Sequence, residues 1–503
     1  MFINSKKIGN LKNIYYSKYF IWTIIFIGIL IRIRQYLFNR SLWIDEASLA
    51  LNILKLNYAE LLTPLLHGQA APPFFLLLTK LFTAVAGYSE YVLRFLPFIC
   101  GIVSIILFYP LAAYFLQKKV IPIAISLLSF SYYHIYFTNE FKQYSVDLFF
   151  TLLLIMCALK TDNSNFSKKY STYFGITAII STWFSHASIF VLGGVGLALL
   201  YKLLLERGAG EKNAVKVSQI KELIAIGLLS LFSFALHYFF IIRPVPKGHF
   251  YQFWEKGFMP FPPLSLSDIK WYFSTAMGTL KVPLGFEYLY GMAFIFLLIG
   301  IIGLWKRKEK LYFNLLMFPV IVLLLASTFR FYPFRGRLVL FILPITYLFI
   351  SEGISQFIKY FYPHKRLLAV FIVIFLLLYP VFNGISYLFK PILREESRPV
   401  IEYCLANKEK DDKIYVYPHA KRAFEYYTRE LSLEPLPSVP ISRKNTGEYI
   451  KELEKLRGTG RVWFIFSHTI QDEDELFLTY LDYIASQLDS YQARGASTYL
   501  YNL

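Results

Sequence analysis

Cysteine is scarce in this chain, with three residues among 503. Cys100, Cys157 and Cys404 lie far apart, without the spacing of metal-binding cysteines, and two of them fall inside apolar runs. We therefore expect neither a disulfide framework nor a zinc site.

Charged residues are also few, at 17% of the chain, and acidic residues are outnumbered, with 33 Asp and Glu against 52 Lys and Arg. A net charge of +19 would suggest a nucleic-acid partner in a soluble protein. In this chain, however, 56% of the residues are hydrophobic, the mean hydropathy is +0.46, and the basic residues fall mainly in short loops between apolar runs. This pattern predicts a polytopic membrane protein surrounded by membrane lipids, with no nucleic acid among its partners.

The first apolar run lacks the small-residue site at which a signal peptide is cut. This run, residues 21–33, contains Arg32 near its end and leads on to Arg34 and Trp43. We expect this run to be retained as a membrane span.

About eleven apolar runs are long enough to cross a bilayer as helices. They are predicted at residues 19–37, 91–116, 119–137, 143–160, 170–186, 188–205, 222–242, 287–305, 311–329, 337–358 and 366–388. If the N-terminus is cytoplasmic, five basic loops fall on the cytoplasmic side, as is usual for membrane proteins. These loops contain Lys118 and Lys119; Lys160, Lys168 and Lys169; Arg207, Lys212, Lys216 and Lys221; Lys306, Arg307, Lys308 and Lys310; and Lys365 and Arg366. We predict a multi-pass protein of the inner or plasma membrane.

Residues 71–88 form a twelfth apolar run, but it opens with two prolines and contains Lys80. A crossing at this run would move every later loop to the other side and break the charge rule. We therefore predict a helix that lies in the outer interface. It belongs to a long outer loop, residues 38–90. A second outer loop, residues 243–286, is rich in proline and aromatic residues, and together the two loops can roof a cavity.

The composition becomes charged and water-soluble after Lys390. Alternation predicts strands at 413–417, 461–466 and 498–501, and helical spacing predicts helices at 446–456 and 473–488. The chain therefore divides into a transmembrane domain, residues 1–389, and a small extracytoplasmic α/β domain, residues 390–503. The second domain has no glycine-rich phosphate loop, repeat or low-complexity segment, and we interpret it as a lid or docking domain without chemistry of its own.

The most distinctive stretch is Ser-Leu-Trp-Ile-Asp-Glu-Ala-Ser, residues 41–48, just beyond the first apolar run. Carboxylates beside hydrocarbon are costly, so Asp45 and Glu46 are candidates for function. Two short outer loops, 137–144 and 329–337, have basic residues against the general charge bias. Positive charge kept on the outer side indicates that an anion is bound there.

Several short motifs follow one another between residues 20 and 350. They are Trp43-Ile-Asp45-Glu46, His67, Pro72-Pro73, Gly87 to Glu90 with Arg94 and Pro97, Asn139 to Tyr144, and Arg337 to Pro344. In this order they resemble the landmarks of family 39 type glycosyltransferases, which are GT-C fold enzymes related to protein O-mannosyltransferases and the lipid A aminoarabinose transferase. The resemblance implies a polyprenyl-phosphate sugar as donor, used on the outer face. The chain departs from the pattern at Ala71, where the aminoarabinose enzymes have lysine, and at Lys142, where arginine is usual.

Sugar transfer from a lipid phosphate needs a base for the acceptor hydroxyl and cations for the departing phosphate. We predict that Asp45 is the base; the alternative is that it caps a helix at 46–54. Glu46 is the second catalytic candidate, because it can orient the acceptor or a neighbouring cation. The alternative is that Glu46 only stabilises the same helix, because a negative side chain is favoured in the positively polarised first turn. One base without a second carboxylate placed as a nucleophile predicts inversion at the anomeric carbon.

The substrate-binding candidates are His67, Arg94, Glu140, Lys142, Tyr144, Arg335 and Arg337. The two later arginines offer forked donors suited to phosphate oxygens. Structural alternatives stay open, because a histidine can be a structural donor, a lysine can snorkel, and arginines beside a span can anchor it at the interface. His186 has a weaker claim. Since the phosphate departs on a lipid, no cofactor is expected to be obligatory, and a divalent metal stays open.

We therefore predict an integral membrane glycosyltransferase that moves one monosaccharide from a polyprenyl-phosphate donor to an extracytoplasmic lipid, glycan or protein. Two alternatives stay open. A polysaccharide polymerase or ligase would use a diphosphate-linked oligosaccharide, and a flippase or transporter of lipid-linked sugar would not be an enzyme. A transporter more often has paired broken helices or charges near the middle of the membrane, whereas the notable charges in this chain cluster at the outer boundary.

Overall fold

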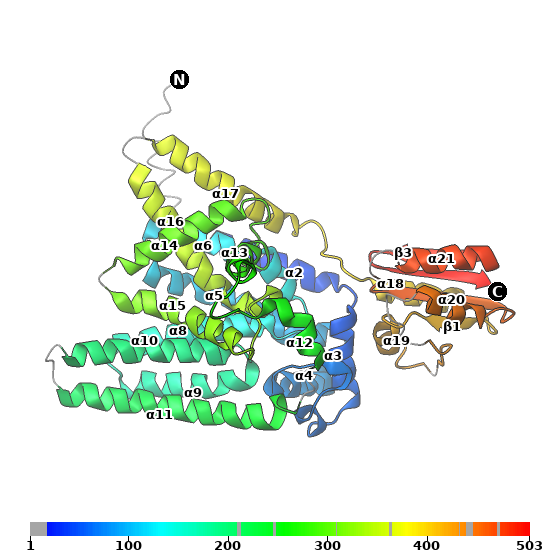
Figure 1. Cartoon of the computed structure of the whole chain (residues 1–503), viewed down its shortest axis with the longest axis horizontal. Coiled ribbons are helices and arrows are strands. Elements are labelled where there is room, and N and C mark those ends of the chain that lie inside the picture. The colour runs from blue at the N-terminus through cyan, green and yellow to red at the C-terminus, as the bar shows by residue number, and fades with distance from the viewer. Residues whose placement is uncertain are drawn as a thin grey trace.

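The computed structural model describes residues 18–208, 213–244, 248–307, 309–361, 365–431, 433–438, 446–469 and 473–503. The described part has two regions (Figure 1). Long helices form the larger region, and a small α/β region at the C-terminal end is joined to it by a single stretch of chain. Parts of three predicted basic loops, at 209–212, 308 and 362–364, lie outside the described residues.

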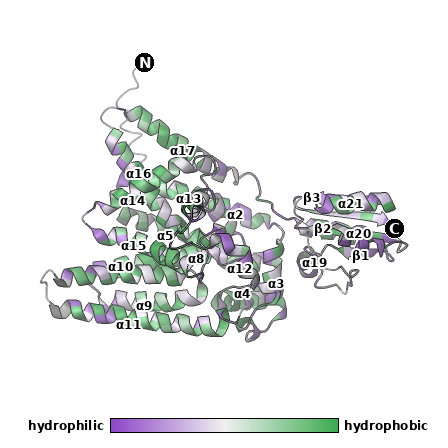
Figure 2. Cartoon of the chain, viewed as in Figure 1, coloured by the Kyte–Doolittle hydropathy of each residue, from purple (hydrophilic) through white to green (hydrophobic). Residues whose placement is uncertain are grey.

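Eight helices among the described residues are long and apolar enough to cross a membrane. They are α2 (Lys18–Phe38), α5 (Glu90–Phe115), α8 (Tyr144–Asn163), α10 (Ser188–Gly208), α11 (Asn213–His237, continued by the π turn Tyr238–Ile242), α15 (Lys310–Thr328), α16 (Leu343–Phe361, preceded by the 3-10 segment η6, Gly336–Ile342) and α17 (Arg366–Ser386). Apolar residues dominate these helices (Figure 2). The chain is thus a polytopic α-helical membrane protein, as the sequence predicts.

The sequence predicts about eleven spans, which is more than the number of described helices that are long enough to cross a membrane. Two of the predicted spans are the shorter helices α9 (Lys168–Phe184) and α14 (Tyr290–Trp305), with 17 and 16 residues. A third predicted span is bent by 50° and consists of η3 (Lys118–Val120), α6 (Ile121–Ser129) and α7 (Tyr132–Thr138). The number eleven therefore stays a prediction, as does the side of the membrane on which each loop lies.

The bend between α6 and α7 is stabilised by Arg32 of α2, whose side chain is fully buried. Its guanidinium donates to the backbone oxygens of Ser129 and Leu128 at 2.8 and 3.3 Å, and lies 2.7 Å from Nδ1 of His134. The last carbonyls of a helix have no partner within the helix, so a buried cation that satisfies them fixes the break. The short helix α7 then leads into the turn 139–143, which contains several candidate site residues.

Two segments between these helices form the predicted outer loops. The first contains α3 (Ile44–Lys55), η1 (Glu60–Leu62), η2 (Leu66–Gly68) and α4 (Pro73–Ala86), and the second contains α12 (Gly248–Trp254), η5 (Glu255–Gly257) and α13 (Leu266–Lys281). With its 14 residues, α4 is about 21 Å long, which is short of the ~30 Å of a bilayer core. This length agrees with the prediction that residues 71–88 do not cross.

The C-terminal region is built around one four-stranded sheet. Its elements are α18 (Ser397–Asn407), β1 (Lys413–Val416), α19 (Lys421–Tyr427), α20 (Thr446–Glu454), β2 (Arg461–Ser467), α21 (Glu473–Ile484), β3 (Ser486–Ala493) and β4 (Ala496–Asn502). The strand order is β1-β2-β4-β3, with β1 and β2 parallel and the other pairs antiparallel. The sheet packs on its own apolar core, in which Trp463 is fully buried.

The three predicted strands of this region are confirmed, but the predicted helix 473–488 is wrong at its end. The helix α21 ends at Ile484, and residues 486–493 form the edge strand β3. Most side chains of β3 are partly or fully exposed, so its sequence lacks the apolar alternation that marks a strand. Its conformation is set by backbone pairing with β4, which the local sequence does not reveal.

Candidate active site

The helix α3 positions the acidic pair beside the C-terminal region (Figure 1). Its N-cap residue is Trp43, in an extended conformation, and no side chain of the loop caps the helix. Asp45 is the second residue of α3, so the alternative in which Asp45 caps a helix is wrong.

Asp45 contacts Arg337, which lies 292 positions later at the start of η6. Arg337 Nη2 donates to Asp45 Oδ2 at 2.7 Å, and both side chains are about one quarter exposed. The guanidinium of Arg337 also lies 5.4 Å from the ring centre of Trp43 and 5.8 Å from that of Tyr144. These rings give the cation an apolar wall, and about a quarter of each side chain of the pair stays exposed.

Burial by itself would raise the pKa of Asp45. The positive charges of Lys142, Arg337 and Arg394 outweigh this effect and hold the pKa of Asp45 below its ordinary value. Asp45 is therefore ionised at neutral pH, in surroundings that are positively charged.

Glu46 and Arg94 form a buried ion pair next to this site. Arg94 Nε and Nη2 donate to the two carboxylate oxygens of Glu46, both at 2.8 Å, and the backbone N–H of Phe141 donates to Glu46 Oε1 at 2.7 Å. Arg94 also donates to the backbone oxygens of Arg40 and Ser41. The pair thus fastens α3, α5 and the turn 139–143 to one another. Burial would raise the pKa of Glu46, but the charge of Arg94 lowers it.

The turn 139–143 brings two further candidates toward Asp45. Lys142 is buried and its Nζ donates to Gln69 Oε1 at 2.6 Å. Glu140 is fully buried, and neither of its carboxylate oxygens has a hydrogen-bond partner within the described residues. Arg40 lies 3.7 Å from it. Burial, with the nearby charge of Glu46, raises the pKa of Glu140, while burial lowers the pKa of Lys142.

Three predicted residues lie apart from this cluster. His67 has a left-handed backbone (φ 62°). Burial and the charge of Arg422 lower the pKa of His67, and because Arg422 belongs to α19, His67 lies near that helix. Arg335 is exposed and lies beside Gly257 of the second outer loop. His186 is stacked on His237, with ring centres 5.0 Å apart.

Sequence reasoning missed Arg394, which enters the site from the segment between α17 and α18. Its guanidinium carbon lies 3.2 Å from the ring centre of Trp43, and its Nη1 donates to the hydroxyl of Tyr136 at 2.8 Å. The local sequence around Arg394 has no motif, and the only available signal was a basic residue on the predicted outer side.

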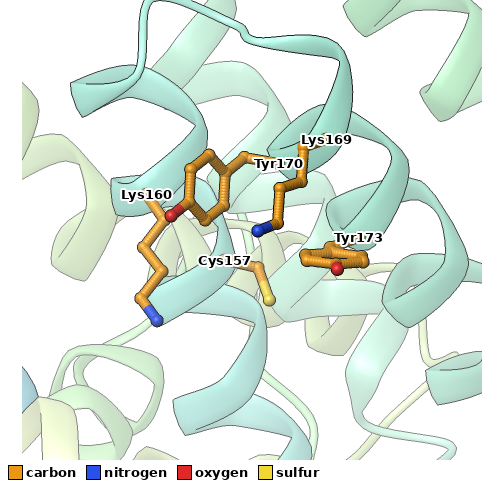
Figure 3. A pocket seen from close by; sticks show the side chains of 5 residues that line it. All are labelled: Cys157, Lys160, Lys169, Tyr170 and Tyr173. Atoms are coloured by element: carbon orange, nitrogen blue, oxygen red, sulfur yellow. The ribbon is translucent and has the colours of Figure 1, made fainter.

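A pocket of about 300 Å³ lies elsewhere, near the opposite end of α8 from Tyr144 (Figure 3). Its lining residues are Cys157, Lys160, Lys169, Tyr170 and Tyr173, none of which belongs to the site described above. Within the described ranges, no group of three or more His, Cys, Asp or Glu side chains is arranged to hold a metal ion.

No protein-family model and no curated protein matches this chain. Solved structures do match it in three dimensions. ArnT from Cupriavidus metallidurans in the apo state aligns with a TM-score of 0.52 and 10% identity over 95% of this chain and 97% of that chain, and the same protein bound to undecaprenyl phosphate aligns with a TM-score of 0.51 and 11% identity over 96% and 97%. The archaeal oligosaccharyltransferase AglB from Archaeoglobus fulgidus, in complex with an inhibitory peptide and a dolichol-phosphate, aligns with a TM-score of 0.50 and 14% identity over 96% of this chain and 74% of that chain.

These alignments confirm the fold that the resemblance implied. The chain has the GT-C fold, with a small C-terminal sheet. At such low identities the comparison establishes the architecture, and the chemistry has to be argued from the residues of the site.

Proposed function

We propose that this chain is a membrane glycosyltransferase that transfers a monosaccharide from a polyprenyl-phosphate donor to an acceptor outside the cytoplasm. The contact between Asp45 and Arg337 is the main support, because it sets a carboxylate that can accept a proton beside a forked cation that can bind a phosphate. The neighbours bound to undecaprenyl phosphate and dolichol-phosphate support a lipid phosphate as the carrier.

In the proposed reaction, Asp45 takes the proton of the acceptor hydroxyl as its oxygen forms a bond to the anomeric carbon. The bond between the anomeric carbon and the phosphate oxygen breaks, and its electron pair leaves on the polyprenyl phosphate. Arg337 and Lys142 stabilise the negative charge that develops on this phosphate. The acceptor attacks from the side opposite the phosphate, so the anomeric configuration is inverted.

The lowered pKa of Asp45 makes it a weak base in the resting site. A donor phosphate that contacts Arg337 takes up part of the positive charge that Asp45 experiences. Donor binding therefore raises the pKa of Asp45 and makes it a stronger base when the acceptor arrives. This coupling favours proton abstraction only when the donor is in place.

The other candidates take supporting roles in this proposal. Glu46 and Arg94 are positioning residues, because the carboxylate of Glu46 and the guanidinium of Arg94 are hydrogen-bonded to each other. The ring of Tyr144 lies near the guanidinium of Arg337, and Glu140 favours the charged form of Arg337 electrostatically. His67 and Arg335 are assigned no step at the reacting atoms.

Mass spectrometry of lipids and envelope glycans from cells with and without the gene tests the proposal. We expect the deletion strain to accumulate a polyprenyl-phosphate monosaccharide and to lack one sugar on a lipid, glycan or protein outside the cytoplasm. Accumulation of a diphosphate-linked oligosaccharide would instead favour a polymerase or ligase. Unchanged amounts of all lipid-linked sugars and glycans would contradict the proposal.

A further inference from the structure

The segment between α17 and α18 is held against the C-terminal end of α2. The side-chain amide of Gln35 donates to the backbone oxygens of Tyr387 and Lys390 at 2.6 and 2.9 Å, and the N–H of Ile392 donates to Gln35 Oε1 at 2.8 Å. These contacts fix the path of the chain immediately before residues 394–396, which lie beside the start of α3.

Two carboxylates of this segment bind the backbone at the start of α3. The N–H of Ile44 donates to Glu395 Oε2 at 3.2 Å, and the N–H and hydroxyl of Ser41 both donate to Glu396 Oε2 at 3.1 Å. The first amides of a helix have no partner within the helix, and Trp43 gives this one no side-chain cap. The chain leading to the C-terminal domain therefore supplies the cap that the local sequence of α3 lacks.

Contacts farther along the chain join the domain to the same outer loop. The N–H of Leu42 donates to the hydroxyl of Tyr427 at 2.7 Å, and Arg429 donates to the backbone oxygen of Tyr88 at 3.0 Å. Glu395 Oε1 lies 2.7 Å from Nδ1 of His468, which follows β2. The domain is thus packed onto the loop that contains the acidic pair.

Arg394 occupies the point of this segment that faces the site. Its guanidinium is placed between the ring of Trp43 and the hydroxyl of Tyr136. Unlike Arg94 and Arg337, it forms no ion pair with a carboxylate among the described residues. An arginine that is partly buried against aromatic rings, without a carboxylate partner, keeps forked donors available for an anion.

We propose that Arg394 binds the phosphate of the lipid-linked donor, as a third cation beside Arg337 and Lys142, and that the C-terminal domain serves to deliver it. This inference rests on the proposed function, because it deepens the donor site. It assigns a contact with substrate to a region that we interpret, from the sequence alone, as a lid or docking domain without chemistry of its own.

Binding of two probes to the purified full-length protein in detergent tests the proposal. The probes are a polyprenyl monophosphate and the corresponding polyprenol, which lacks the phosphate. We expect Arg394→Gln to weaken binding of the monophosphate roughly tenfold to a hundredfold and to leave binding of the polyprenol unchanged. The matched control is Arg398→Gln, because Arg398 lies in the same part of the chain but binds Glu90 and the backbone oxygen of Asn39. It should bind both probes about as the wild type does.

Equal affinity of the wild type and Arg394→Gln for the monophosphate would overturn the inference. An equal loss of affinity for both probes would also overturn it, because Arg394 would then act through the shape of the site. A wild-type protein that does not prefer the monophosphate over the polyprenol would contradict the proposed function itself. If Arg394→Gln does not fold, Arg394→Lys decides: weaker binding of the monophosphate alone supports the inference, and unchanged binding of both probes overturns it.

Discussion

Glu46 and Arg94 satisfy each other through two hydrogen bonds of 2.8 Å, in surroundings that exclude solvent from both side chains. The two residues lie in different helices, α3 and α5, and the pair joins these helices at the residue that follows Asp45 in the chain. The neighbouring acidic residues thus differ in environment, because Glu46 is fully paired whereas Asp45 is partly exposed beside cations.

This difference predicts a loss of stability for Glu46→Gln. The variant leaves Arg94 charged and buried without its carboxylate, which should cost about 3–5 kcal/mol of the free energy of unfolding. Thermal unfolding of the purified protein measures the effect. Glu430→Gln is the control, because the Glu430 side chain is 85% exposed. A Glu46→Gln protein as stable as the wild type but without turnover would assign Glu46 to the chemistry instead.

The sequence predicts that Arg335 and Arg337 together clamp the phosphate with their forked donors, and the structure separates their environments. We expect Arg337→Lys to lower turnover roughly tenfold to a thousandfold, because a point charge does not reproduce a forked contact at the site of developing charge. Arg335→Lys should keep nearly wild-type turnover, since Arg335 is exposed beside Gly257. Equal losses in the two variants would restore the predicted clamp. Wild-type turnover in Arg337→Lys would remove Arg337 from the proposed mechanism.

Glu140 gives a prediction about pH and stability. Its pKa is raised by burial and by the charge of Glu46, so its contribution to stability is present at low pH and is lost as the pH rises through the folded-state pKa. At neutral pH the carboxyl of Glu140 therefore costs stability, and Glu140→Gln should unfold at a higher temperature than the wild type. The advantage should disappear as the pH falls below about 4.

Asp412 is a matched control for Glu140, because its pKa is shifted in the opposite direction. Burial would raise its pKa, but the hydrogen bonds from Arg461, Trp463 and the backbone N–H of Glu409, together with the charge of Arg461, outweigh burial and lower the pKa of Asp412. Asp412→Asn should therefore be less stable than the wild type at neutral pH, with the difference shrinking as acid protonates the native carboxylate. A Glu140→Gln protein that is less stable than the wild type at neutral pH would show that the surrounding arginines need this charge.

The predicted orientation can be tested by labelling single cysteines in intact cells. In a background without Cys157, we expect Lys410→Cys to react with an impermeant thiol reagent and Asn163→Cys to be protected. Both positions are exposed in the structure, and the native Cys100 and Cys404 are buried. Equal labelling of the two positions, or labelling of Asn163→Cys alone, would contradict a cytoplasmic N-terminus with an outer C-terminal domain.

The sequence predicts those parts of the structure whose signal is local. Long apolar runs predict most of the helices. A carboxylate pair beside a span, together with basic residues in outer loops that run against the general charge bias, indicates the site around Asp45 and Arg337. The partners of buried charges have no such signal. Glu46 and Arg94 lie 48 positions apart, and only the packing of α3 on α5 shows that they neutralise each other.

Residues that join the site from distant segments escape sequence reasoning for the same reason. Arg394 is 351 positions from Trp43 in the numbering, and no repeat or motif connects them. The strand β3 is hidden because an edge strand with exposed side chains has no apolar pattern. His67 matches a motif in sequence, yet the fold directs it toward α19 rather than toward Asp45.

The turnover of purified Asp45→Asn with its natural donor and acceptor tests the role of Asp45 as the base. Asparagine keeps the shape of the side chain but does not accept a proton at neutral pH, and α3 does not depend on Asp45 for its cap. We expect a loss of turnover on the order of a hundredfold to ten-thousandfold, with unfolding temperature and binding of a polyprenyl monophosphate largely preserved. Wild-type turnover in this variant would contradict the assignment of Asp45 as the base.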